Sequence, residues 1–148
     1  MRHSYDELLT TLAEEIGLDA PSLLATEEIL IDNLPISLQL EGTDDKAEVL
    51  LCSLLGAVHA DRWAQVSRTL LLANHGWTGT RGCTLGVVPD DDTVSLSMRR
   101  PLHSLNADKL AAMLGWVTDI GLAWKEYVAG DSSTEPPVLF QNHFNAYA

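Results

Sequence analysis

The side chains best suited to metal binding or nucleophilic catalysis in this sequence are its five histidines and two cysteines. No two histidines have the i, i+4 spacing that puts two imidazoles on one helix face, and no C-x-x-C occurs. Cys52 and Cys83 both fall in segments that we expect to be strands, so buried thiols in a reducing compartment are predicted. No transition-metal site is predicted from the histidines, which are scattered along the chain: His3, His59, His75, His103 and His143.

A run of three aspartates and a set of spaced glycines are the other candidates for chemistry. Asp90–Asp92 lacks the spaced oxygen ligands of a calcium loop and is better explained as a hairpin turn. Gly76, Gly79 and Gly82 follow a predicted helix, whereas phosphate-binding glycine loops follow a strand. A Ser-His-Asp or Cys-His set could assemble only in three dimensions. We therefore expect no catalytic residue, no metal and no cofactor, and a protein that is not an enzyme.

The charge of the chain restricts its partners. Nine Lys and Arg against 21 Asp and Glu give a net charge of −12 in 148 residues. Such a surface repels phosphate backbones, so nucleic-acid binding is not expected. High negative charge can serve solubility alone, or it can shield an aggregation-prone partner. The longest apolar runs, such as Leu70–Ala73, are too short to cross a membrane, and the N-terminus lacks the apolar stretch of a signal peptide. We expect a cytoplasmic protein without membrane insertion.

Apolar periodicity predicts an α+β fold of order αβββαββα, in which helices pack on a twisted antiparallel sheet. Ser4 and Glu7 have capping-box spacing and Gly17 is a natural C-cap, which predicts a helix between them. Asp61 and Asn106 are expected to cap the two later helices. The predicted segments are helix Tyr5–Ile16, strands Glu28–Asp32, Ile36–Glu41 and Ala47–Leu55, helix Asp61–Asn74, hairpin Cys83–Arg99 with its turn at Pro89–Asp92, and helix Ala107–Val128.

The last 18 residues differ in composition from the rest. Residues 131–137 are rich in Ser and Pro, which predicts a boundary between a domain at 1–130 and a Pro-containing tail at 131–148. Val138–Phe140 and Phe144 are apolar without a clear period. Three possibilities stay open for this tail: docking on its own domain, adding to a neighbour, or staying loose.

Several segments, taken in order, resemble class I type III secretion chaperones, the Tir-chaperone-like family. Tyr5–Leu18 is similar to the first helix of that family, and Leu70–Asn74 is similar to the Leu-Leu-x-x-Asn ending of its second helix. Thr84–Val87 with Thr93–Leu102 resembles its late hairpin, and the segment from Leu105 to Trp124 resembles its last helix. The similarity covers residues 4–129.

The resemblance implies a bacterial cytoplasmic homodimer that binds the N-terminal chaperone-binding segment of a secreted effector. Such a chaperone keeps its effector soluble and competent for secretion without ATP, and contributes to virulence. The implied effector contacts are Leu9, Leu12, Leu38, Leu40 and Leu51. The implied dimer interface is Trp63, Val66, Leu70, Leu85 and Val87. Leu71 and Leu72 widen the apolar stripe of the second helix, which fits either burial on two sides of one domain or contact with a second subunit.

Two alternatives stay open at this point. One is a YbjN-like relative that shares the architecture and has no secretion role. The other is a small-ligand-binding domain or enzyme whose site forms only in three dimensions, which would have a deep pocket with convergent polar groups.

Overall fold

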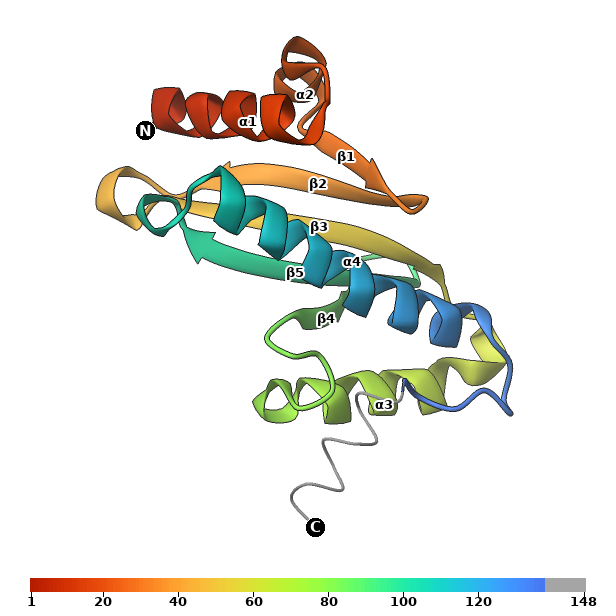
Figure 1. Cartoon of the computed structure of the whole chain (residues 1–148). Helices are drawn as coiled ribbons and strands as arrows, with labels where there is room; N and C mark the ends of the chain where they lie inside the picture. Colours follow the sequence, from red (N-terminus) through yellow and green to blue (C-terminus); the bar gives the residue numbers. More distant parts are fainter. Residues whose placement is uncertain (138–148) are drawn as a thin grey trace. The chain divides into compact units, whose positions relative to one another are not determined.

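The computed structural model describes residues 1–137, which form an α+β fold around a five-stranded sheet (Figure 1). The strand order is β1-β2-β3-β5-β4, with antiparallel pairing along β1–β2, β2–β3 and β4–β5. The predicted fold class is therefore confirmed. The helices are α1 Arg2–Ile16, α2 Ala20–Thr26, α3 Trp63–Asn74 and α4 Ala107–Ala129, and the strands are β1 Glu28–Ile31, β2 Leu34–Glu41, β3 Glu48–Ala57, β4 Thr84–Val87 and β5 Thr93–Pro101.

The chain divides into two compact units, and the longest elements contribute to both. Unit 1 consists of residues 1–52 and 99–118, and unit 2 consists of residues 53–98 with the chain from 119 onward. Each unit is described by itself below. This division does not test the predicted boundary between a domain at 1–130 and a tail at 131–148, which stays a prediction. The tail residues 138–148, including Val138–Phe140 and Phe144, lie outside the described part.

The core of unit 1 is built from one face of α1 together with inward-facing residues of the sheet and the first half of α4. Helical spacing puts Tyr5, Leu9 and Leu12 on a single side of α1, and each is fully buried. Each fully buried aliphatic side chain contributes about 2 kcal/mol of hydrophobic stabilisation. The sheet and α4 side of this core consists of Leu34, Ile36, Leu38, Val49, Leu51, Leu110, Leu114 and Val117.

The first helix starts earlier than its sequence predicts. Ser4 lies inside α1 rather than at the N-cap, because the helix begins at Arg2. The Arg2 guanidinium lies 3.1 Å from Asp6 one turn later and 2.9 Å from Glu27 at the end of α2, which stabilises the additional turn. The other end agrees with expectation, since Gly17 adopts the left-handed conformation of a C-cap.

A second short helix was not predicted. Pro21 and Ser22 look like a helix break in the sequence, but they form the first turn of α2. Asp19 Oδ2 accepts a hydrogen bond from the Ser22 amide at 3.0 Å, and proline is compatible with a first helical turn because its missing N–H would have no partner there. Figure 1 shows α2 beside the C-terminal end of α1, where the two helices pack together.

The β1–β2 turn is shorter than the sequence predicts, and β1 ends at Ile31 rather than Asp32. Asp32 and Asn33 both have positive φ, and Ile31 pairs with Leu34, which is the geometry of a two-residue type I′ hairpin. Strand β2 therefore begins at Leu34 rather than Ile36.

In unit 2 the predicted hairpin is confirmed. Val88 N donates to Thr93 O at 3.0 Å and Asp91 N donates to Val88 O at 3.1 Å, so residues 89–92 form the turn. The predicted cap of α3 is wrong: Asp61 lies in a 3₁₀ turn, Ala60–Arg62, and makes no capping hydrogen bond. By contrast, Asn106 Oδ1 in unit 1 accepts from Lys109 N at 2.9 Å, as the sequence predicts for the start of α4.

Candidate functional site

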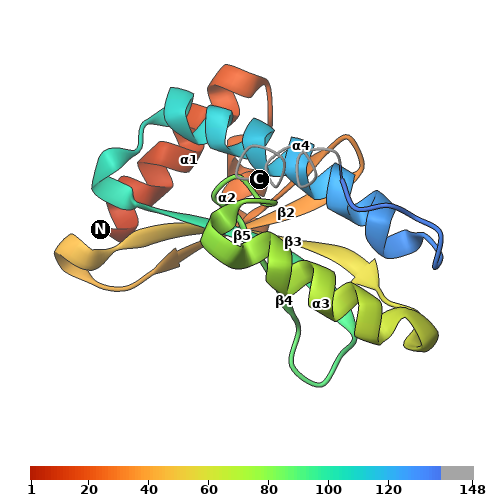
Figure 2. The ribbon, with the colours of Figure 1, turned by 90° about the horizontal axis from the view of Figure 1, so that it is seen from below.

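Unit 2 exposes apolar side chains on α3 and the strand beside it. Helix α3 packs against β4, which lies at one edge of the sheet (Figure 2). Four large apolar residues on α3, β4 and the segment between them are solvent-exposed, and we call them the α3–β4 surface: Leu71 at 72%, Leu72 at 38%, Trp77 at 57% and Val87 at 40%. Exposed apolar residues gathered on adjoining elements are typical of protein–protein contacts.

The α3–β4 surface is held in place by one asparagine. The Asn74 amide donates to Leu85 O at 2.7 Å, and Leu85 N donates to Asn74 Oδ1 at 2.9 Å. These two bonds join the end of α3 to the edge strand β4. They occupy the backbone N–H and C=O groups of Leu85, which an added strand could otherwise use. Asn74 is the last residue of the Leu-Leu-x-x-Asn segment noted in the sequence, so its chemistry explains why an asparagine suits that position.

The predicted dimer residues all lie in unit 2, but they differ in exposure. Val66, Leu70 and Leu85 are buried, Trp63 is half-buried and Val87 is exposed. The buried residues form the inner side of α3 and β4, while Leu71 and Leu72 present the outer side. The sequence signal for Leu71 and Leu72 was the run of three leucines, because three consecutive positions of a helix cover more of its circumference than one packing face requires. The interface itself stays a prediction.

The predicted effector contacts all lie in unit 1. Leu9, Leu12, Leu38 and Leu51 have no exposed surface, and Leu40 is half-buried. Only Leu40 of this set is therefore available to a bound chain in this conformation. The effector assignment stays a prediction.

Strand β1 supplies an open sheet edge in unit 1. It pairs with β2, and Leu38 N donates to Glu27 O at 2.8 Å, which sets the alternation of backbone groups along the pair. By that alternation the N–H groups of Glu28 and Leu30 face away from β2. The Glu28 N–H donates to Thr26 Oγ1 at 3.4 Å. Leu30 is 65% exposed, and its outward N–H is the group to which an added strand could bond.

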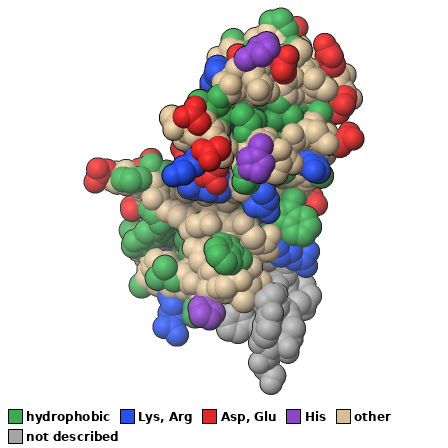
Figure 3. All heavy atoms as spheres, turned by 90° about the vertical axis from the view of Figure 1, so that its left-hand side faces the viewer, with side chains coloured by type: hydrophobic (Ala, Val, Ile, Leu, Met, Phe, Trp, Pro, Cys, Tyr) green, Lys and Arg blue, Asp and Glu red, His purple; other side chains and the backbone are tan. Residues whose placement is uncertain are grey.

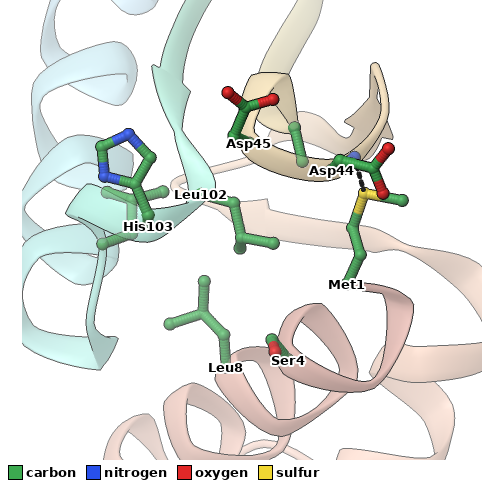
Figure 4. Close-up of a pocket in the computed structure, with 9 residues that line it drawn as sticks. Met1, Ser4, Leu8, Asp44, Asp45, Leu102 and His103 are labelled. Atoms are coloured by element: carbon green, nitrogen blue, oxygen red, sulfur yellow. Dashed lines mark hydrogen bonds between the residues drawn. The ribbon is translucent and has the colours of Figure 1, made fainter.

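A pocket of about 510 Å³ lies at the N-terminal end of α1, also within unit 1. Figure 4 shows Leu8 and Leu102 pointing toward one another in it, with Asp44 and Asp45 on a neighbouring 3₁₀ turn. On the face drawn in Figure 3, recessed apolar side chains are visible with acidic and histidine side chains near them. The pocket thus combines an apolar floor with a polar rim.

The titratable groups with shifted pKa values indicate structure rather than catalysis. Desolvation raises the pKa of the half-buried Cys52 thiol, and desolvation together with the nearby Glu27 carboxylate raises the pKa of Tyr5. Both shifts favour the neutral, less reactive form. Within residues 1–137 no three His, Cys, Asp or Glu side chains come together as a metal site, and no helix there is long and apolar enough to span a membrane.

We expect both cysteines to react slowly with iodoacetamide at mildly alkaline pH. Cys52 has a raised pKa, and Cys83 is buried, so little accessible thiolate forms at either residue. Alkylation followed by mass spectrometry is expected to be at least about tenfold slower in the native chain than in concentrated urea. Equal rates in the two conditions would contradict the assignment of both thiols to structural positions.

Comparisons with known proteins agree with this fold. A family model described as the Tir chaperone protein (CesT) family matches residues 7–118. A chain of the HopA1–SchA chaperone–effector complex is 18% identical with a TM-score of 0.67, and the match covers 83% of this chain and 94% of that one. A chain of the ExsC–ExsE complex is 20% identical with a TM-score of 0.70, covering 89% and 97%.

A third solved structure contains the Yersinia pestis type III secretion chaperone SycH with a stable fragment of YscM2. It is 18% identical with a TM-score of 0.54, covering 80% of this chain and 97% of that one. No curated protein sequence matches. The predicted family and the prediction of a non-enzymatic protein are both confirmed by the family match, which spans most of the described residues. The chain belongs to the Tir chaperone protein family.

Proposed function

We propose that this chain is a class I type III secretion chaperone of the bacterial cytoplasm that works as a homodimer. It binds the N-terminal chaperone-binding segment of a secreted effector and keeps that effector soluble and competent for secretion without ATP. The observation that carries the proposal is the family match over residues 7–118. Support comes from the shared fold of three solved protein complexes, of which one is named as a chaperone–effector complex and another as a type III secretion chaperone with a fragment of a second protein.

Binding in this proposal needs no chemical step. A disordered effector segment gains order by burying its apolar side chains and by hydrogen bonding through its backbone, and the open edge of β1 offers such bonds. The net charge of −12 keeps the complex soluble while the segment is bound. Of the predicted effector contacts, the half-buried Leu40 touches the effector segment directly. The other four are core residues that hold the helix and strands of the binding surface in place: Leu9, Leu12, Leu38 and Leu51.

The homodimer is proposed to form through the α3–β4 surface. On α3 the exposed Leu71 and Leu72 form the outer side and the predicted interface residues Val66 and Leu70 form the inner side. On β4 the exposed Val87 shares one face of the strand with the buried Leu85. A second copy would bury the exposed apolar side chains in a self-complementary contact.

The function is tested by a pull-down with the tagged chain from cells that express the secretion system, with bound proteins identified by mass spectrometry. One dominant partner, retained through a segment near its N-terminus, is the expected result. Absence of any protein partner from such cells would contradict the proposal and favour a YbjN-like role.

The β1 edge is tested by replacing Leu30 with proline. We expect Leu30→Pro to weaken partner binding about tenfold, because proline removes an outward N–H, and such a hydrogen bond contributes about 1 kcal/mol or slightly more. The β1–β2 pairing should persist, since proline is tolerated on an edge strand. Affinity is measured by titration calorimetry with the partner found in the pull-down.

Leu30→Ala is the matched control for this edge. It removes the same exposed side chain and keeps the N–H, so it separates backbone pairing from side-chain contact. If both variants bind as tightly as the parent, strand addition at β1 is excluded.

A further inference from the structure

The pocket of unit 1 has a composition that selects among ligands. Its floor is apolar: Leu8 is 9% exposed and Ala47 is 3% exposed, and Leu102 and Leu105 are half-buried. Its volume of about 510 Å³ falls in the range of pockets that enclose small molecules or single side chains of a partner. The polar lining groups are Ser4, Asp44, Asp45 and His103.

The negative charge on the rim comes from two carboxylates that form no ion pair with the side chains of residues 1–137. Both residues, Asp44 and Asp45, belong to the 3₁₀ turn Asp44–Lys46. Lys46 is exposed and does not line the pocket. Within the turn, Ala47 N donates to Asp44 O at 3.2 Å. Asp44 N donates to the side chain of Met1, whose Sδ lies 3.0 Å away. Figure 4 shows this contact beside the pocket.

A ligand matched to this site has an apolar stem and a cationic end. The stem contacts Leu8, Leu102 and Leu105, and the cation lies beside Asp44 and Asp45 on the rim. A divalent metal fits less well, because hard cations take six or more oxygen ligands and the pocket offers two carboxylates. A lysine side chain has the required form, since its four-carbon stem packs on apolar surface while its ammonium stays at the edge.

We propose that this pocket receives a lysine side chain from the bound segment of the partner protein. The inference rests on the proposed function, because it names a chemical feature of the segment that the chaperone binds. It predicts that a basic residue anchors part of that segment at the N-terminal end of α1. The net charge of −12 raises the local concentration of cationic segments and speeds their encounter.

The test uses a probe that needs no knowledge of the partner. The ¹⁵N-labelled full chain is titrated with hexylammonium, hexanoate and 1-hexanol, and amide shifts are followed by NMR. Hexylammonium is expected to shift amides of pocket residues and to bind at least about fivefold more tightly than hexanoate, because the two carboxylates attract one probe and repel the other. 1-Hexanol is expected to fall between them.

Two double variants complete the test. Asp44→Asn with Asp45→Asn is expected to reduce the preference for hexylammonium to below about twofold, and asparagine tolerates the positive φ of residue 44. Glu14→Gln with Glu15→Gln removes the same charge from exposed positions of α1 outside the pocket and is expected to retain the preference.

Equal binding of hexylammonium and hexanoate, shifts that map away from the pocket, or the absence of any shift would each overturn the proposal. So would an unchanged preference in the Asp44, Asp45 double variant. None of these outcomes bears on whether a secreted partner is captured in the pull-down, so failure of the pocket and failure of the chaperone function are separate results.

Discussion

Replacing Leu71 with aspartate is expected to convert the proposed homodimer into a folded monomer at micromolar concentration. Leu71 is 72% exposed on α3, so an aspartate there is solvated in the monomer and costs the fold little. In a dimer the same carboxylate would be buried without a partner, at a cost of several kcal/mol. Because a twofold interface repeats every residue, both copies bear this cost, and the dissociation constant should rise at least about 100-fold.

Light scattering after size-exclusion chromatography measures the mass directly. Ala112→Asp is the matched control, because it adds the same charge at an exposed helical position of α4 in unit 1, outside the α3–β4 surface. This control should stay dimeric. A Leu71→Asp chain with dimer mass would remove the α3–β4 surface from the interface.

Leu70 is a poorer choice for this experiment although it belongs to the predicted interface. Its side chain is only 4% exposed, so a carboxylate there would unfold unit 2 as well as disturb any dimer. The sequence shows three consecutive leucines from 70 to 72, of which helical spacing predicts Leu70 on the apolar stripe and leaves open what Leu71 and Leu72 contact. The structure assigns the inner position to Leu70 and the outer positions to Leu71 and Leu72.

The parts of the fold that the sequence predicts are those with strong local signals. Helix α4 has a long apolar stripe and an asparagine cap, and the β4–β5 turn has Pro and Asp at turn positions. Gly17 ends α1 because its left-handed φ of 77° is costly for other residues. These features act within a few residues, so a single sequence reveals them.

The errors occur where one local pattern fits two structures. Pro21 suits both a helix break and a first helical turn, and Asp19 decides in favour of the helix by capping it. Ser4 has the spacing of a capping box, but the ion pair between Arg2 and Asp6 favours an earlier start. The candidate site shows the same limit, because leucines of unit 1 that look available in sequence are buried once the core forms.

The most important contact that sequence reasoning missed is made by Arg62. Its side chain is 4% exposed and lies at the C-terminal end of α4, within unit 2. Nη1 donates to Val128 O at 3.0 Å and to Gly130 O at 2.7 Å, and Nη2 donates to Tyr127 O at 3.1 Å. The guanidinium also lies 5.3 Å from the centre of the Tyr127 ring. In the sequence, nothing distinguishes this arginine from the other basic residues.

Replacing Arg62 with methionine is expected to lower the free energy of unfolding by about 3 kcal/mol. Three carbonyl groups at a helix C-terminus would lose charged donors, each such bond contributing about 1.5 kcal/mol or more, and the favourable position of a cation at that helix end would be lost. The methionine side chain has no charge to desolvate, and this gain offsets part of the lost hydrogen-bond energy. The net loss of stability therefore stays at about 3 kcal/mol. Urea unfolding followed by circular dichroism measures the change.

Two further substitutions separate the charge of Arg62 from its geometry. Arg62→Lys keeps the cation but cannot reach several carbonyls at once with a planar fork, so it should recover less than half of the loss. Arg100→Met on β5 removes an equal charge from an exposed position outside the α3–β4 surface and should change stability by less than about 0.5 kcal/mol. An Arg62→Met chain as stable as the Arg100→Met chain would show that the end of α4 holds without this contact.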